Sequence, residues 1–504
     1  MQRIRIERLL VCWGFFVFFP AAVWGQSLQK SGLVYLQTIP VPGWKATGTP
    51  GNANVDVMGF NPVTQTMYLA DRTNHGIDVI DTHTRSVVGL IPVPGIGTCG
   101  SCPNVPLVAI DLQQLVVSDG LSSVYVWDLR APQPSQPDKY TFPVNMGTNT
   151  DGLDYDPINQ TVYVVTDNQP EFLIGISLPL KKIVSQTPLP ASSDLIKFNP
   201  IDGKIYIAAE DADGNHNNTA AGVYAYDPAT GPTGVVTLVS RIGPPCPGHG
   251  IDIDPISNIA VMGCFGGTGD RGDVAVNLSN GALLTTFTDV GGTDTVVFNP
   301  NNRRFYAAVG LNTATTSGCP KGTGPFTPIL GVMDASGPSH NPVRLDGVVC
   351  TGGGHIAGVD PITNFVYVPV SQFPADPNSA TTGQNGVLVF FDSSPLAQTP
   401  IKQAKATLSP IDRGLTKASV EMTLDRRRMH VTSSITGVTG QAAWLVIPTT
   451  VGNELVPCAV NTSAHAVNCA DDLLGDPLIG SIATLSVDAV AVARGSIRHG
   501  SDDE

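Results

Sequence analysis

Residues 56–81 read DVMGFNPVTQTMYLADRTNHGIDVID: a short apolar run, a turn at Asn61-Pro62, and two strand-like segments that each end in aspartate. The same pattern returns six times before Asp392, at intervals of roughly 40–60 residues. The further turns are Asp111-Leu112, Asp156-Pro157, Asn199-Pro200, Asp254-Pro255, Asn299-Pro300 and Asp360-Pro361. Units of this length with several short strands are typical of propeller blades, so the sequence predicts an all-β, seven-bladed β-propeller.

The copies also agree beyond the turn. In the first copy, Met67–Asp71 is followed by Gly76–Asp81 and then by Ser86–Val93. The tyrosine-bearing strand returns at Val162–Val165, Ile205–Ala208, Phe305–Ala308 and Val366–Pro369. This repeat resembles the YVTN family of bacterial surface-layer and periplasmic propellers, over about four-fifths of the chain. The resemblance implies an architecture and not an activity, because propellers host binding proteins and enzymes alike.

The domain layout follows from where the repeat begins and stops. Residues 26–400 are assigned to the propeller, and the 53 Gly and 41 Pro of the 504 residues fit a turn-rich β fold of this kind. Leu33–Pro42 reads as the last strand of a blade with no blade before it, whereas the seventh repeat ends at Asp392 without a fourth strand. We therefore expect the N-terminal strand to complete the seventh blade and close the ring.

The remaining sequence loses the repeat. Residues 401–497 are expected to form a small C-terminal β-rich, sandwich-like domain, and 498–504 a polar tail. Alternating apolar and polar residues in Ser419–Leu424 and Ala443–Ile447 favour strands there. An irregular eighth blade around Asp425 is the alternative.

The start of the chain predicts export. Arg3, Arg5 and Arg8 precede an apolar stretch from Leu9 to Val23, so residues 1–25 have the features of a secretory signal peptide. No later segment reaches the roughly 18–20 apolar residues of a membrane span. The mature protein is therefore expected to be periplasmic or extracellular.

Cysteine spacing supports the same compartment. The eight cysteines after the predicted leader fall into local pairs: Cys99/Cys102, Cys246/Cys264, Cys319/Cys350 and Cys458/Cys469. Four disulfides are the simplest interpretation in an exported chain. A redox motif or half of a zinc site at Cys99–Cys102 is the alternative, although the segment lies in a Gly/Pro-rich loop and has no second Cys-x-x-Cys to complete four ligands.

Charge disfavours nucleic acid as a partner. The formal net charge is −14, and removal of the predicted leader, with its three arginines, makes it more negative. Such a surface repels phosphate backbones. The basic cluster Arg426–Arg428 is short and follows Asp425, so it is interpreted as a solvated surface.

One register position carries the candidate site. The turn residue of each repeat is the Asn or Asp that begins its turn. Five residues before the turn residues stand Asp56, Pro106, Asp151, Asp194, His249, Asp294 and His355. In a propeller this position enters the innermost strand, so these side chains are expected to converge at one mouth of the central channel. The six ionisable residues are candidate metal ligands, for Ca²⁺ if the aspartates dominate and for a transition metal such as Zn²⁺ if the histidines take part.

His249 and His355 lie in glycine-rich loops and are also candidate acid–base catalysts for hydrolase or lyase chemistry. The structural alternative is that each of these residues caps backbone groups of the neighbouring blade and binds nothing. Three functional classes follow: an exported binding module for a protein, glycan or small ligand; a metal-assisted hydrolase, lactonase or lyase; and a structural cell-surface protein.

Overall fold

A computed structural model describes most of the chain. The propeller part covers residues 32–44, 54–97, 99–100, 102–168, 170–210, 221–231, 234–242, 246–265, 272–310, 328–336, 343–351, 354–370 and 385–394. Backbone is also described for the strands between 403 and 499. The predicted leader at 1–25, Arg426, Arg427 and residues 500–504 lie outside the described residues.

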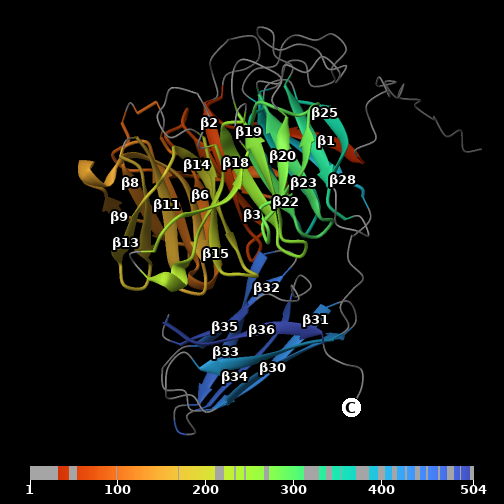
Figure 1. Cartoon of the computed structure of the whole chain (residues 1–504). Helices are drawn as coiled ribbons and strands as arrows, with labels where there is room; N and C mark the ends of the chain where they lie inside the picture. Colours follow the sequence, from red (N-terminus) through yellow and green to blue (C-terminus); the bar gives the residue numbers. More distant parts are fainter. Residues whose placement is uncertain are drawn as a thin grey trace, which may run out of the picture.

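Seven four-stranded antiparallel sheets surround one axis (Figure 1), which confirms the predicted seven-bladed propeller. Blades 1–3 consist of β2 (Val55–Asn61), β3 (Thr66–Asp71), β4 (Gly76–Asp81) and β5 (Ser86–Pro92); β6 (Pro106–Ala109), β7 (Gln114–Asp119), β8 (Ser123–Asp128) and β9 (Asp138–Thr141); and β10 (Thr148–Asp156), β11 (Thr161–Asn168), β12 (Phe172–Ser177) and β13 (Lys182–Pro188).

Blades 4–6 follow the same order. They consist of β14 (Ser193–Asn199), β15 (Lys204–Ala209), β16 (Gly222–Tyr226) and β17 (Thr237–Arg241); β18 (Gly248–Asp254), β19 (Ile259–Cys264), β20 (Asp273–Asn277) and β21 (Leu283–Phe287); and β22 (Thr293–Asn299), β23 (Arg304–Val309), β24 (Ile329–Asp334) and β25 (Arg344–Cys350). The first strands β10, β14, β18 and β22 contact one another in turn, so the first strand of each blade is the innermost.

Blade 7 closes the ring. It combines β26 (Gly358–Asp360), β27 (Phe365–Val370) and β28 (Gly386–Asp392) with β1 (Leu33–Ile39) from the start of the described chain. Strand β1 pairs antiparallel with β28, from Leu33 opposite Asp392 to Ile39 opposite Val387. The predicted closure by the N-terminal strand is confirmed.

The repeated turn explains why every blade begins with a tight hairpin. Asn61 Oδ1 accepts backbone hydrogen bonds from Val63 (3.0 Å) and Thr64 (3.4 Å). The same contact recurs at Asp156, Asn199, Asp254, Asn299 and Asp360. The residue that opens the next strand takes a positive φ at Gln65, Gln113, Gln160, Gly203, Asn258, Arg303 and Asn364. The side chain holds the turn, and the left-handed residue gives the hairpin its twist.

Glycines let neighbouring inner strands approach closely. A Cβ on Gly152 would lie 2.1 Å from the Asp194 carbonyl oxygen, and one on Gly250 would lie 2.5 Å from that of Asp294. Only glycine fits at such contacts. The approach brings β10 against β14 and β18 against β22, next to residues of the predicted channel-mouth position.

The strands described beyond residue 400 pair with one another. Strands β29 (Gln403–Pro410), β30 (Lys417–Asp425), β31 (Arg428–Thr436), β32 (Ala443–Thr449), β33 (Gly452–Asn461), β34 (Ala466–Leu473), β35 (Ile482–Val487) and β36 (Val490–His499) pair in one closed order. Because β36 returns to pair with β29, these ladders form neither the two sheets of the predicted sandwich nor a four-stranded eighth blade.

The 3₁₀ helices are η1 (Ile110–Leu112), η2 (Val144–Met146) and η3 (Pro228–Thr230), and no described helix is long and apolar enough to cross a membrane.

Three of the predicted cysteine pairs stand at disulfide distance: Cys99–Cys102, Cys246–Cys264 and Cys458–Cys469. Cys350 is also disulfide-bonded, and its predicted partner Cys319 lies outside the described residues. The pairing favours a disulfide over half of a zinc site at Cys99–Cys102.

Ring closure predicts a contrast within one strand. Ile39 of β1 is 1% exposed, whereas Leu36 on the same strand is 41% exposed. Ile39→Ala should lower the free energy of unfolding by about 2–5 kcal/mol, because it leaves a cavity between the closing strand and the core. Leu36→Ala should change it by less than about 0.5 kcal/mol. Urea unfolding of both variants checks this, and equal small effects would contradict closure by β1 as a stabilising device.

Candidate functional site at the channel mouth

The structure brings the predicted channel-mouth residues into one interacting group. Asp194 in β14, His249 in β18 and Asp294 in β22 come from three successive inner strands. Each of the three offers one ligand atom within 4.8 Å of the other two. His355, just before β26, places Nε2 3.6 Å from Oδ2 of Asp294. Four of the six ionisable positions therefore form one cluster.

His249 lies at the centre of this cluster. Its Nδ1 atom lies 2.8 Å from Oδ2 of Asp194 and 3.5 Å from Oδ1 of Asp294. On the other edge of the ring, Nε2 contacts Oε1 of Glu210. The ring of Phe265 packs against the imidazole with a centroid separation of 4.3 Å. Carboxylates thus lie beside both nitrogens of His249, and an aromatic ring packs against the imidazole.

The other two aspartates have different neighbours. Asp56 is paired with Arg72, whose guanidinium also donates to Oδ1 of Asn104 at 2.7 Å and to the Pro103 carbonyl at 3.2 Å. The negative charges of Asp194 and Asp56 act on the carboxyl group of Asp151 and raise its pKa. Asp56 thus has a cation from the protein itself, whereas Asp194 and Asp294 face imidazoles.

Burial and mutual repulsion set the protonation of the carboxyl groups. Burial, opposed by Arg72 and reinforced by Asp294 and Asp194, raises the pKa of Asp56 to about 8. Burial and the neighbouring carboxylates also raise the pKa of Asp151 well above its usual value. Burial raises the pKa of Asp194 as well, although His249 opposes the rise. An added cation would favour the ionised form of all three groups.

The neighbouring carboxylates also determine the pKa of the histidine. Burial by itself would lower the pKa of His249, but Asp194, Asp294 and Glu210 outweigh it and raise the pKa well above its usual value. Burial would raise the pKa of Asp294, but His249, His355 and Arg72 together lower it. A protonated His249 therefore stands where a bound cation would relieve the same carboxylates.

Sequence reasoning missed four residues of the group: Arg72, Asp167, Glu210 and Phe265. The missed residues share a second register, eleven residues after the turn residue, at the end of the second strand of their blades. Their contacts with the predicted position are those of Arg72 with Asp56, and of Glu210 and Phe265 with His249. The same count from each repeated turn would have found them, because strand one of a blade begins, and the antiparallel strand two ends, at the same mouth.

Solved structures share the architecture. A chain in the crystal structure of the Mitotic Checkpoint Complex is 10% identical to this chain, with a TM-score of 0.51 over 78% of this chain and 99% of that chain. The crystal structure of the RRP9 WD40 repeats is 11% identical, with a TM-score of 0.48 over 70% of this chain and 98% of that chain. At an identity of 10%, the likeness to the chain of the Mitotic Checkpoint Complex shows the fold alone. No protein-family model and no curated protein matches the chain, so the YVTN resemblance stays a prediction.

The Arg72–Asp56 pair predicts a pH-dependent effect. In Arg72→Met, Asp56 loses its cation, and its pKa rises further above 8. Below pH 8 Asp56 is largely protonated in both folded proteins, so the two unfolding free energies should have the same pH dependence. Above pH 8 the folded parent releases this proton and its stability levels off, whereas the variant keeps the proton and continues to lose stability.

Urea unfolding at pH 6 and pH 9.5 measures this difference. The destabilisation by Arg72→Met should be larger at pH 9.5, by on the order of 1–2 kcal/mol. Adding Asp56→Asn to the variant should remove most of the pH-dependent part; the remainder comes from Asp151 and Asp294, whose pKa values Arg72 also lowers. A destabilisation that is the same at both pH values would contradict the assigned pairing.

Proposed function

We propose that this protein is a cation-dependent binding module, in which Asp194, His249 and Asp294 hold a divalent metal ion at the channel mouth. The observation that carries the proposal is the position of His249, with Nδ1 facing two carboxylates and Nε2 facing a third. A transition metal such as Zn²⁺ or Mn²⁺ suits this donor set better than Ca²⁺, because one donor is an imidazole nitrogen.

The spacing of the donor atoms supports a shared ion. When metal–ligand bonds are about 2.0–2.1 Å long, adjacent ligand atoms of a tetrahedral site lie about 3.3 Å apart. The Nδ1 separations of 2.8 Å and 3.5 Å from the two aspartates fall on either side of this value. Small side-chain rotations are enough to place one ion among the three atoms.

Glu210 has the place of an orienting group. Metal-bound histidines usually donate their second N–H to a carboxylate or carbonyl, which fixes the tautomer and the ring orientation. Glu210 meets Nε2 of His249 on the side away from the two aspartates. With Nε2–H donated to Glu210, Nδ1 is left as the ligand atom.

The ion would supply the binding function. Three protein ligands leave at least one coordination position of a zinc-like ion open. An oxygen atom of a partner can fill that position: a carboxylate of a protein or small molecule, or a hydroxyl of a glycan. The ligand would then lie at the face of the propeller where the inner strands begin, in contact with the residues around the mouth.

A second function, metal-assisted hydrolysis, is favoured by one observation. The side chain of His355 is 34% exposed and lies beside Asp294, so it is accessible to a molecule bound at the ion. In this role the open position of the ion polarises an ester or lactone carbonyl, and His355 accepts the proton of the attacking water. Release of acid from simple lactones by the zinc-loaded protein, lost in His355→Ala with zinc still bound, would distinguish this function from binding alone.

The proposal includes export to the periplasm or the cell exterior. The leader-like sequence of residues 1–25 supports it, and so do the disulfide pairs in the described residues. A structural role at the cell surface is compatible with the same location and would not need the metal site.

Metal titration of the purified mature protein tests the central claim. Zn²⁺ should bind with a stoichiometry of one at the channel mouth, and Ca²⁺ should compete weakly. His249→Ala should weaken binding by more than about 100-fold, because it removes the only nitrogen ligand. Glu210→Gln should weaken it by about 10–100-fold, as removal of an orienting partner does elsewhere.

His83→Ala is the matched control, since His83 is exposed on the β4–β5 turn and should leave zinc affinity unchanged. Isothermal titration calorimetry gives the zinc affinity, and elemental analysis gives the zinc stoichiometry. A parent protein that binds no zinc, or a His249→Ala variant that binds it equally well, would leave the cluster as a structural network of caps.

A further inference from the structure

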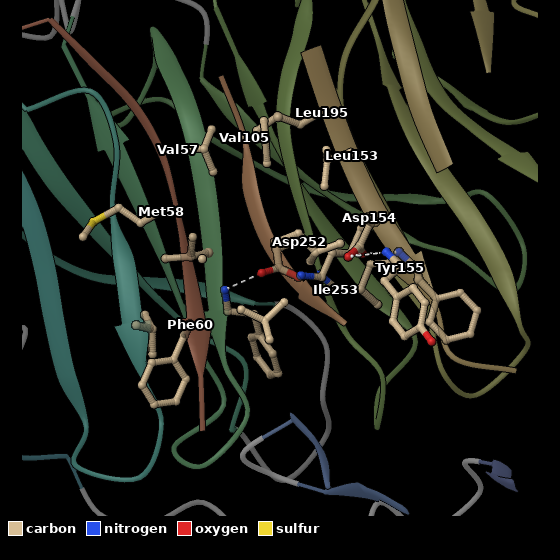
Figure 2. A pocket seen from close by; sticks show the side chains of 18 of the residues that line it. Val57, Met58, Phe60, Val105, Leu153, Asp154, Tyr155, Leu195, Asp252 and Ile253 are labelled. Atoms are coloured by element: carbon tan, nitrogen blue, oxygen red, sulfur yellow. Dashed lines mark hydrogen bonds and ion pairs between the residues drawn. The ribbon is translucent and has the colours of Figure 1, made fainter. Parts of the chain in front are cut away.

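A second candidate site lies inside the central channel. A cavity of about 350 Å³ is enclosed by the inner strands, on the side of the repeated turns (Figure 2). Its size lies within the range of small-molecule binding pockets. None of the proposed metal ligands lines it.

Most of its wall is apolar and comes directly from the repeat. The residue before each turn residue lines the cavity, and in six blades it is large: Phe60, Ile110, Tyr155, Phe198, Ile253 and Phe298. The prolines of the repeated turns line it as well, at Pro62, Pro200, Pro255, Pro300 and Pro361. Water in a chamber with such walls finds few hydrogen-bond partners, so an apolar molecule displaces it favourably.

Two of the charged groups in the wall have a structural role. Asp154 accepts a hydrogen bond from the backbone N–H of Phe198 at 2.7 Å, and Asp252 accepts one from that of Phe298 at 2.8 Å (Figure 2). Each carboxylate therefore satisfies an amide on the open edge of the next inner strand. These contacts join blade 3 to blade 4 and blade 5 to blade 6.

Lys197 is different, because among the described residues its ammonium group pairs with Asp252 alone. Its Nζ lies 3.4 Å from Oδ1 of Asp252, and its side chain is 38% exposed. An ammonium group has three N–H donors, and this ion pair uses one of them. Burial would lower the pKa of Lys197, but Asp252 and Asp154 outweigh it and raise the pKa, so the group stays charged and is a poor nucleophile.

Charge balance selects the class of ligand. Lys197 with Asp154 and Asp252 sums to one negative charge, which disfavours an anion. The ammonium disfavours a cation at the same place. A neutral molecule with an oxygen acceptor avoids both penalties, since its carbonyl or hydroxyl oxygen accepts a hydrogen bond from Nζ while its rings contact the phenylalanines and prolines.

We propose that this chamber binds an uncharged, mainly aromatic or cyclic molecule, on the order of 15 non-hydrogen atoms in size, whose carbonyl or hydroxyl oxygen accepts a hydrogen bond from Lys197. The site is independent of the metal site at the mouth. It adds a hydrophobic ligand class to a protein whose mouth takes oxygen-bearing ligands.

The test uses prodan, a neutral naphthalene ketone of suitable size whose fluorescence shifts to the blue in an apolar site. The chelated, metal-free protein should bind one prodan with a saturable blue shift. Leu107→Trp, which fills the chamber from blade 2, should abolish the signal, whereas Leu180→Trp, at a 61% exposed position, should not change it. Far-UV circular dichroism confirms that both variants are folded.

Lys197→Met separates the polar contact from simple partitioning. Loss of the hydrogen bond from a charged donor should weaken prodan binding by about tenfold and shift its emission further to the blue. Lys182→Met, at an exposed outer-strand position, is the matched control. The His249→Ala variant should bind prodan as tightly as the parent protein, because His249 does not line the cavity. A result that contradicts the metal site would therefore not contradict the prodan site. A signal that does not saturate, or that is unchanged in Leu107→Trp and Lys197→Met, would overturn the proposal.

Discussion

The close approach of seven inner strands around one axis is the constraint on which the rest of the molecule depends. Those strands have an open edge toward the channel, and its amides need partners. Glycines such as Gly152 and Gly250 let adjacent strands come within contact of backbone oxygens. Asp154 and Asp252 then satisfy amides of the next strand. The same approach places Asp194, His249 and Asp294 within reach of one another.

The channel therefore combines two environments. At the mouth, carboxylates and imidazoles crowd together, and their burial raises the pKa of several aspartates. Toward the repeated turns, phenylalanines and prolines surround a lysine and two aspartates. Both aspartates accept hydrogen bonds from backbone amides: Asp154 and Asp252 each cap a backbone amide of the next inner strand. Capping does not explain His249, whose two ring nitrogens both face carboxylates instead of backbone groups.

The fold could be predicted from the sequence because every repeat contains the residues that form its own turn. The Asn or Asp side chain binds backbone amides two or three residues ahead, a local interaction that any reader of the chain can recognise at Asn61 or Asp254. Closure by Leu33–Ile39 followed from an orphan strand at one end and a missing strand at the other. The convergence of Asp194, His249 and Asp294 followed from their common register.

Other features depend on contacts between blades or between registers, which one repeat does not encode. The pairing of Asp56 with Arg72, and of His249 with Glu210, joins the first strand of a blade to the end of a second strand. The six candidate ligands were therefore predicted as one set, although Asp56 pairs with an arginine whereas Asp194 and Asp294 face His249. The closed pairing of β29–β36 was also missed, because alternating strands fit a sandwich and a closed ring equally well.

The most direct measurement is anomalous X-ray diffraction on either side of the zinc absorption edge, from crystals of the mature protein grown with equimolar zinc. The account predicts one dominant zinc peak among the side chains of Asp194, His249 and Asp294, about 2.0–2.1 Å from Nδ1 of His249. Zinc bound only elsewhere, or an empty cluster with His249 still seated between its carboxylates, would contradict it.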